Sequence, residues 1–156
     1  MKIIYCGNGE IATARVAGLI HLQKLPPDRI PSQKEIETAV LPDLSVECGI
    51  PAFLGKDAAN NQIYIIDLGK VGNLAFLTIA GIIAGSEEQW SFRDLSPVGN
   101  HLLCCGRILR RIGMAQAAQR VTTKGIQSCY FQLARFVFKP DGLYSDSKKF
   151  VTIKQS

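Results

Sequence analysis

Apolar residues recur along this chain in two forms, as short unbroken runs and as longer stretches at helical spacing. Residues 2–6 form an unbroken run, which is typical of a strand in the middle of a parallel sheet. Residues 10–24 follow with a wide apolar stripe and end at the proline pair Pro26-Pro27, which predicts a helix. The later chain repeats this order, with strands predicted at 62–67, 89–93 and 119–122 and helices at 73–84, 96–112 and 123–139.

This alternation of strands and helices predicts an α/β fold. With right-handed crossovers it gives a three-layer Rossmann-like domain, with a mostly parallel sheet of about four to five strands and helices on both faces. Residues 52–54 and 62–67 flank a polar, Asn-rich connection, which adds a β-hairpin. We expect one α/β domain over residues 1–140 and a tail over 141–156, in which 150–153 can form an edge strand.

Two helices carry clear signals at their ends. Ser32, with Glu35 three residues later, is a capping box. Ser96 followed by Pro97 predicts the N-cap and first position of a longer helix, and Gly113 predicts its end. Apolar residues recur at helical spacing along it, namely Val98, Leu102, Cys105, Leu109 and Ile112.

The stretch 73–84 is apolar on every side. A helix without a polar face must be covered all round, so we expect either a deep core position or a homo-oligomer contact through residues 74–84. The uncharged run 74–85 is well short of the roughly 20 residues that span a bilayer, so we predict no membrane span.

The turn after the first strand is the main candidate for a binding site. Residues 7–12, Gly-Asn-Gly-Glu-Ile-Ala, match G-x-G-x-x-A, which lets a phosphate approach the backbone at a helix N-terminus. A nicotinamide or flavin site is disfavoured, because Asp28 follows two prolines instead of ending a second strand and Glu10 adds negative charge. A smaller phosphate or anion site and a tight turn without a ligand both remain open.

A ligand at this turn would lie where the parallel strands end. It would be a phosphorylated metabolite or a nucleotide, and the sequence identifies no cofactor. The expected contacts are the backbone of Gly7, Asn8 and Gly9 and the side chains of Thr13, Ser96, Asn100 and Lys124. Simpler roles compete with this one, since Ser96 suits a helix cap and Lys124 a solvated lysine.

The sequence offers no paired nucleophile and base, so catalysis stays an open question. Cys6 ends the first strand, but Ala12 stands where a cysteine-dependent phosphatase loop needs its arginine, which favours a buried thiol. His21 is expected to be a satisfied, half-buried histidine. Two distant histidines and the absence of a Cys-x-x-Cys pair argue against a structural zinc site.

Composition and charge limit the class of protein and the kind of partner. The chain has 156 residues, 47% of them hydrophobic and 20% charged, which suits one globular domain. A formal net charge of +5 allows an anionic partner, but no Lys/Arg run is interleaved with aromatics, which disfavours nucleic acid. If nucleic acid bound, it would use Arg107, Arg110, Arg111 and Lys124. Five irregularly spaced cysteines and the lack of a signal peptide predict a cytoplasmic protein with reduced thiols.

A series of short motifs also occurs in a familiar order. Residues 20–22 are Ile-His-Leu, Leu25-Pro26 follows, and residues 28–32 are Asp-Arg-Ile-Pro-Ser. Later come residues 53–57, 63–65 and 94–100, then Gly106, Leu109-Arg110-Arg111, Gly113, Gly125 and Tyr130. Over roughly residues 2–138 this pattern resembles the domain-of-unknown-function family 3189 of spore-forming bacteria. The resemblance implies a fold and no established activity.

The first turn departs from that family's pattern. The family carries Gly-Gly-x-His-Ser-Ser there, and the matching stretch is residues 9–14. The histidine position is Ala12, and only Thr13 keeps a hydroxyl. The resemblance therefore implies that this chain has lost most side-chain contacts that the family's turn could give an anion.

Overall fold

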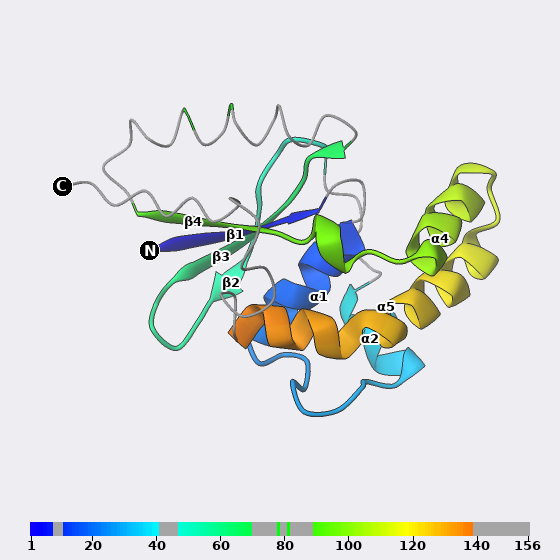
Figure 1. The fold of residues 1–156 in the computed structure, drawn as a ribbon, viewed down its shortest axis with the longest axis horizontal. Helices are drawn as coiled ribbons and strands as arrows, with labels where there is room; N and C mark the ends of the chain where they lie inside the picture. The colour runs from blue at the N-terminus through cyan, green and yellow to red at the C-terminus, as the bar shows by residue number, and fades with distance from the viewer. Residues whose placement is uncertain (8–10, 41–46, 70–77, 79–80, 82–88, 139–156) are drawn as a thin grey trace.

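The computed structural model describes residues 1–7, 11–40, 47–69, 78, 81 and 89–138. Its strands form one open sheet in the order β2-β3-β1-β4 (Figure 1). β1 pairs in parallel with both β3 and β4, whereas β2 is antiparallel to β3. The bounds are β1 Lys2–Gly7, β2 Ala52–Lys56, β3 Gln62–Asp67 and β4 Trp90–Asp94.

Four helices and a short 3₁₀ turn accompany the sheet in the described part of the chain. They are α1 Ile11–His21, α2 Gln33–Val40, the 3₁₀ turn η2 Ser96–Val98, α4 His101–Arg111 and α5 Ala115–Phe138. The described part of the chain is thus a mixed α/β fold with four strands in one sheet and four helices, and the predicted α/β class is confirmed. The predicted hairpin is confirmed by the antiparallel pair β2 and β3.

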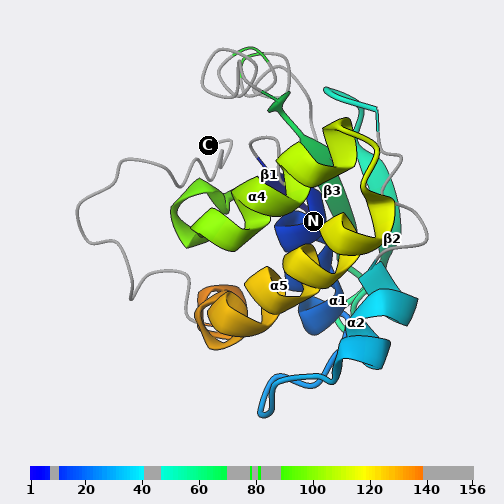
Figure 2. The ribbon, with the colours of Figure 1, turned by 90° about the vertical axis from the view of Figure 1, so that its right-hand side faces the viewer.

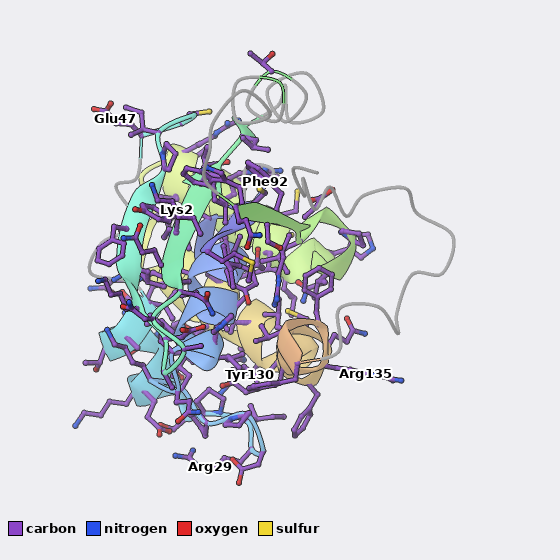
Figure 3. The ribbon with its side chains drawn as sticks, turned by 90° about the vertical axis from the view of Figure 1, so that its left-hand side faces the viewer. Lys2, Arg29, Glu47, Phe92, Tyr130 and Arg135 are labelled. Carbon is purple, nitrogen blue, oxygen red and sulfur yellow. The ribbon has the colours of Figure 1, made fainter. Side chains whose placement is uncertain are left out.

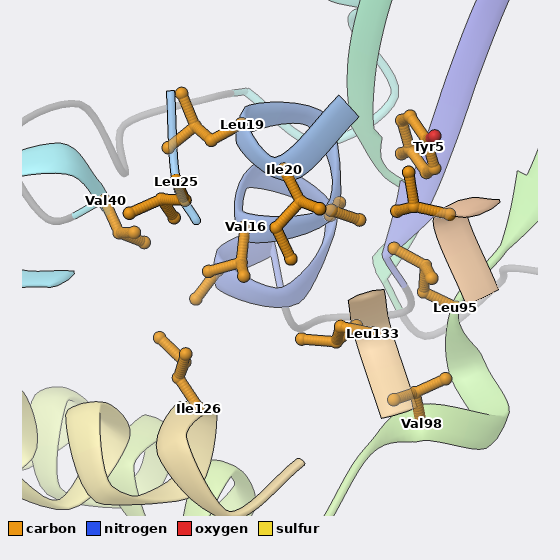
Figure 4. Close-up of a cluster of buried hydrophobic side chains, with 14 of the residues drawn as sticks. Tyr5, Val16, Leu19, Ile20, Leu25, Val40, Leu95, Val98, Ile126 and Leu133 are labelled. Atoms are coloured by element: carbon orange, nitrogen blue, oxygen red, sulfur yellow. The ribbon is translucent and has the colours of Figure 1, made fainter. Parts of the chain in front are cut away.

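One face of the sheet packs against α1, and α2 and α5 pack against α1 on the same side of the sheet (Figures 1 and 2). Tyr5 of β1 belongs to the same buried cluster as Val16 and Ile20 of α1 and Leu133 of α5 (Figure 4). Ile65 of the neighbouring strand β3 is also a member of this cluster. Alternation along β1 sends Ile4 to the opposite face, into a second buried cluster; its other members are Cys6, Ile66, Leu68 and Phe92. Both faces of the central strand are therefore buried, as its unbroken apolar run predicts.

The capping box of α2 is confirmed. The backbone N–H of Glu35 donates to Ser32 Oγ over 3.3 Å, and the backbone N–H of Ser32 donates to Glu35 Oε2 over 2.7 Å. Arg29 forms an ion pair with Glu35 over 2.6 Å, and these bonds lower the pKa of that carboxyl to about 2. The loop after α1 is thereby tied to the first turn of α2.

The predicted strand at 119–122 is wrong, and so is the predicted start of a helix at residue 123. Both segments belong to α5, which runs without a break from Ala115 to Phe138. Thr122 and Thr123 are both buried inside this helix. Their β-branched side chains favour a strand in isolation, but packing of α5 against α4, α1 and α2 overrides that weak preference.

The predicted start of the helix at Ser96 is also wrong. Ser96 opens η2, and α4 begins after Asn100, whose Oδ1 accepts a hydrogen bond of 3.0 Å from the Leu103 N–H. The other end agrees with the prediction: Gly113 has a φ of 85°, and its N–H donates to the carbonyl of Arg110.

Most of the apolar residues whose helical spacing predicted this helix are not buried. Leu102 is 42% exposed and Ile112 is 64% exposed, and Cys105 is exposed too. The side of α4 that packs on α5 is instead the one with Leu103 and Gly106. A Cβ at residue 106 would overlap Thr122 Oγ1, so glycine lets the two helices approach closely.

Several predictions fall outside the described residues. These are the helix at 73–84 with its homo-oligomer contact, of which only residues 78 and 81 are described, the edge strand at 150–153, and the turn residues Asn8 and Gly9. The division into a domain over 1–140 and a tail over 141–156 stays a prediction.

Candidate functional site

The carboxyl ends of three parallel strands meet at one edge of the sheet. β1 lies between β3 and β4, and the register sets Gly7 beside Asp67 and Cys6 beside Asp94. Beyond the strands, the N–H of Leu68 donates to the Gly7 carbonyl over 2.8 Å and that of Leu95 to the Cys6 carbonyl over 3.0 Å. The carboxyl ends of all three strands therefore lie side by side.

Three of the predicted ligand residues lie close to this edge along the chain. Gly7 is the last residue of β1 and is buried. Thr13 lies in the first turn of α1 with only 2% of its surface exposed. Ser96 follows β4 by two residues and opens η2.

Two more of the seven predicted residues, Asn100 and Lys124, belong to the helical hairpin formed by α4 and α5, while Asn8 and Gly9 lie outside the described residues. The Asn100 amide nitrogen donates to the Gly125 carbonyl and to Ser128 Oγ, each over 2.8 Å. The oxygen of the same amide caps α4, so the Asn100 side chain links α4 to α5. Lys124, next to Gly125, is exposed on α5. The structure thus groups Asn100 with the Lys124 turn of α5.

The charged groups at the strand ends are acidic. Asp67 accepts a hydrogen bond of 2.9 Å from the N–H of Gly69, and Asp94 ends β4. Burial, helped by the negative charge of Asp94, raises the pKa of the Cys6 thiol to about 12. Cys6 is therefore a neutral thiol at physiological pH, as the sequence favoured, and not an activated nucleophile.

A polar network that the sequence did not predict crosses the buried face of the sheet. Arg93 Nη1 of β4 donates to the Tyr5 hydroxyl of β1 over 2.9 Å. That hydroxyl lies 2.7 Å from His21 Nδ1 at the end of α1, and His21 Nε2 lies 3.0 Å from Asp57 Oδ2 in the β2–β3 turn. One chain of hydrogen bonds thereby joins two strands, a helix and a turn.

Both ends of this network are anchored further. Arg93 Nη1 also donates to the Val137 carbonyl near the end of α5 over 2.9 Å. Asp57 Oδ1 accepts from the backbone N–H groups of Ala59 and Asn61, and Asp57 Oδ2 accepts from the Asn61 side chain. The turn after β2 is therefore organised around the Asp57 carboxylate, as in an Asx turn.

The electrostatics of the network hold His21 neutral. Burial lowers its pKa, and the positive charge of Arg93 acts in the same direction, while Asp57 acts against both. Burial raises the pKa of Asp57, but the bonds from Asn61, Ala59 and His21 outweigh it, so the carboxyl stays below its usual range. Neutral His21 then donates from Nε2 to Asp57 and accepts at Nδ1 from Tyr5.

This network is closed to a substrate at its centre. Tyr5 is 0% exposed, and burial raises the pKa of its hydroxyl to about 12. The hydroxyl is thus a structural donor, and His21 is the satisfied, half-buried histidine that the sequence predicts. For the other members of the network, the sequence offered one signal, which is the Asp-Ala-Ala-Asn-Asn turn at 57–61.

Two of the hollows that described residues line do not involve the predicted ligand residues. A polar one of about 340 Å³ is bounded by Met1, Lys2, Asn60, Gln62 and Gln89. An apolar one of about 410 Å³ lies beside α5, lined by Pro27, Phe131, Ala134, Arg135 and Phe138. Arg135 points away from the body of the molecule, whereas Tyr130 turns inward (Figure 3).

The described residues contain no cluster of three or more His, Cys, Asp or Glu side chains that could hold a metal ion. None of the described helices combines the length and hydrophobicity needed to cross a lipid bilayer.

Comparison with known proteins places the chain in a family. A family model described as "Protein of unknown function (DUF3189)" matches residues 2–140. The chain belongs to this family. No curated protein and no solved structure matches this DUF3189 chain. The match covers every described helix and strand, so the whole α/β body above is the family's domain.

Proposed function

We propose that this DUF3189 protein is a three-layer Rossmann-like domain that binds a phosphorylated metabolite or a nucleotide at the carboxyl end of β1. The observation that carries the proposal is the position of β1 between two parallel neighbours. The chain passes from β1 to β3 on one side and then to β4 on the other, so strand order reverses at β1. Open α/β sheets bind ligands at such a switch point.

The proposed contacts come from both sides of this point. Backbone N–H groups of Gly7, Asn8 and Gly9 approach the phosphate, and the first turn of α1 adds Thr13 and a favourable dipole. Ser96 follows the neighbouring strand. Lys124 adds its positive charge from the helical hairpin, whereas both N–H groups of the predicted contact Asn100 already donate to Gly125 and Ser128 within that hairpin.

The aspartates at the ends of β3 and β4 oppose a free anion. Asp67 and Asp94 lie beside β1 in the register, and a negative carboxylate near a bound anion weakens the binding of that anion. A phosphate ligand that arrives with a divalent cation offsets this repulsion. The proposal therefore predicts tighter binding of nucleotides and sugar phosphates when Mg²⁺ is present.

A thermal-shift and calorimetry screen tests this. The probes are ATP, GTP, glucose 6-phosphate and inorganic phosphate, each with and without Mg²⁺. A true ligand at 100 times its Kd adds about 2.7 kcal/mol to the free energy of unfolding. Ser96→Ala and Lys124→Ala should weaken that binding, and Lys34→Ala, an exposed lysine of α2, should not. Absence of any shift, or equal binding by all three variants, refutes the site.

The exposed apolar residues of α4 support a second function, a non-catalytic interaction module without a small-molecule ligand. Ile108 and Ile112 are more than half exposed, as is Met114 just beyond the helix. Monomers rarely present several large apolar side chains together without a partner. Light scattering at increasing protein concentration tests self-association, and a strict monomer would exclude the homo-oligomer form of this function.

A further inference from the structure

The outer side of α4 carries an exposed apolar stripe. Leu102, Cys105, Ile108 and Ile112 lie within an arc of about 120° on a helical wheel. Leu102 is 42% exposed, Ile108 53% and Ile112 64%. The helix lies at the end of the molecule away from the strands (Figures 1 and 2). The stripe is therefore open to a partner, while Leu103 and Gly106 face α5.

All the charged residues of the hairpin that bears this stripe are basic. Residues 95–138 contain six of the 18 Lys and Arg residues and none of the 13 Asp and Glu residues, which leaves 12 basic against 13 acidic residues elsewhere. All the positive net charge of the chain therefore lies on the hairpin. Arg107, Arg110 and Arg111 are on α4 itself, and Arg120 and Lys124 are on α5.

These two properties select among partners. Nucleic acid would satisfy the arginines but would leave isoleucine side chains against a polar, charged surface. A second copy of the chain, docked through the same stripe, would cover the isoleucines but bring two sets of arginines together without an acidic residue between them. An anionic lipid surface satisfies both, with acyl chains for the apolar stripe and lipid phosphates for the arginines.

We propose that α4 docks the protein onto an anionic membrane surface, lying in the plane of the headgroups. Leu102, Ile108 and Ile112 enter the boundary of the acyl chains, and Arg110 and Arg111 contact the lipid phosphates. The helix lies on the bilayer, since its 11 residues are far too few to cross it. This inference rests on the interaction-module function and is independent of the ligand site at β1.

Vesicle sedimentation with the full chain tests it. The vesicles are phosphatidylcholine alone and phosphatidylcholine mixed with phosphatidylglycerol. We expect the protein to sediment with the anionic vesicles at low salt and to stay in solution with the neutral ones. Ile108→Asn with Ile112→Asn should weaken binding about tenfold or more, given the loss of two buried aliphatic side chains.

Two further variants separate the contributions. Arg110→Ala with Arg111→Ala should also weaken binding about tenfold, because each basic residue near an anionic surface contributes several-fold. Ile50→Asn is the matched control, since Ile50 is 53% exposed but lies just before β2. It should bind vesicles like the wild type. All substituted side chains are exposed, so each variant should keep the wild-type melting temperature, which is measured alongside.

Three outcomes would overturn the proposal. The first is no binding to anionic vesicles. The second is binding that the isoleucine variant retains in full, which would reduce it to charge attraction. The third is tight binding of duplex DNA that depends on Arg110 and Arg111 but not on the isoleucines, which would assign the hairpin to nucleic acid. None of these outcomes changes the nucleotide screen, so the two proposals fail separately.

Discussion

Tyr5→Phe removes one oxygen atom from the centre of the buried network. The hydroxyl serves two neighbours, because it accepts from Arg93 Nη1 over 2.9 Å and lies 2.7 Å from His21 Nδ1. Without it, Arg93 Nη1 keeps its bond to the Val137 carbonyl, but His21 Nδ1 loses its donor. Phenylalanine otherwise fills the same space, so the change isolates the hydrogen bonds.

The magnitude follows from burial. An average intramolecular hydrogen bond contributes about 1 kcal/mol net, and a buried group left unpaired costs about 1–3 kcal/mol. Tyr5 is 0% exposed, so water cannot replace the lost partner. We therefore expect Tyr5→Phe to lower the free energy of unfolding by about 2 kcal/mol. With a urea m-value of about 2 kcal/mol per M, the midpoint should fall by about 1 M.

Urea unfolding followed by circular dichroism measures this, with Tyr64→Phe as the matched control. Tyr64 lies on β3 and its hydroxyl donates to the Gln62 side chain over 3.0 Å, but it is only half-buried. Water can take over that bond, so the control should lose less than about 0.5 kcal/mol. Equal losses for the two variants would show that the network adds no net stability.

The network also predicts a pH dependence. His21 has a pKa below its unfolded value of 6.5, mainly through burial, so the folded state binds a proton less readily than the unfolded chain. Its contribution to stability is therefore complete above pH 6.5 and is lost as pH falls below it, by at most about 1.4 kcal/mol per pH unit. In Tyr5→Phe, Nδ1 is free to protonate, and the slope should be shallower. An equal slope in both proteins would contradict this assignment.

Three further predictions rest on local contacts. Gly106→Ala should destabilise the protein by about 1–2 kcal/mol in urea unfolding, because overlap with Thr122 Oγ1 outweighs the roughly 1 kcal/mol gained in helix propensity. Adding Thr122→Ala should restore part of the lost stability. Ser32→Ala should cost about 1 kcal/mol through the cap of α2, whereas Thr38→Ala, exposed on the same helix, should change little; similar losses would argue against the cap. In native protein, thiol titration should count Cys48, Cys104 and Cys105, while Cys6 and Cys129, whose pKa burial raises to about 12 and about 11, react only after unfolding. Five fast thiols in the native state would contradict the packing of both.

Predictions that depend on a few neighbouring residues agree with the structure. The capping box of Ser32 and Glu35, the end of α4 at Gly113 and the β2–β3 hairpin all arise from residues close together in sequence. The same holds for β1 and α1, whose apolar patterns are strong. In each case, the local chain offers its own hydrogen-bond partner or turn geometry, so distant residues are not needed.

Predictions that depend on distant partners fared differently. Thr122 and Thr123 favoured a strand in the sequence, but packing against the neighbouring helices stabilises α5 as one continuous helix. Asn100 replaced Ser96 as the cap of α4 because its amide can also reach Gly125 and Ser128 on α5. The network through Tyr5 joins residues separated by up to 88 positions, which no local pattern reveals.

The sequence by itself determined the strand β1 and the helix α1, whose apolar patterns are strong, together with the capping box of α2, the β2–β3 turn and the end of α4 at Gly113. It also determined that all the charged residues of the segment 95–138 would be basic. Only the tertiary structure decided which side of α4 is buried, since helical spacing creates an apolar stripe whether or not a neighbour covers it. Leu103 and Gly106 face α5 because glycine lets the helices meet there, and Ile108 and Ile112 are left for a partner outside the chain.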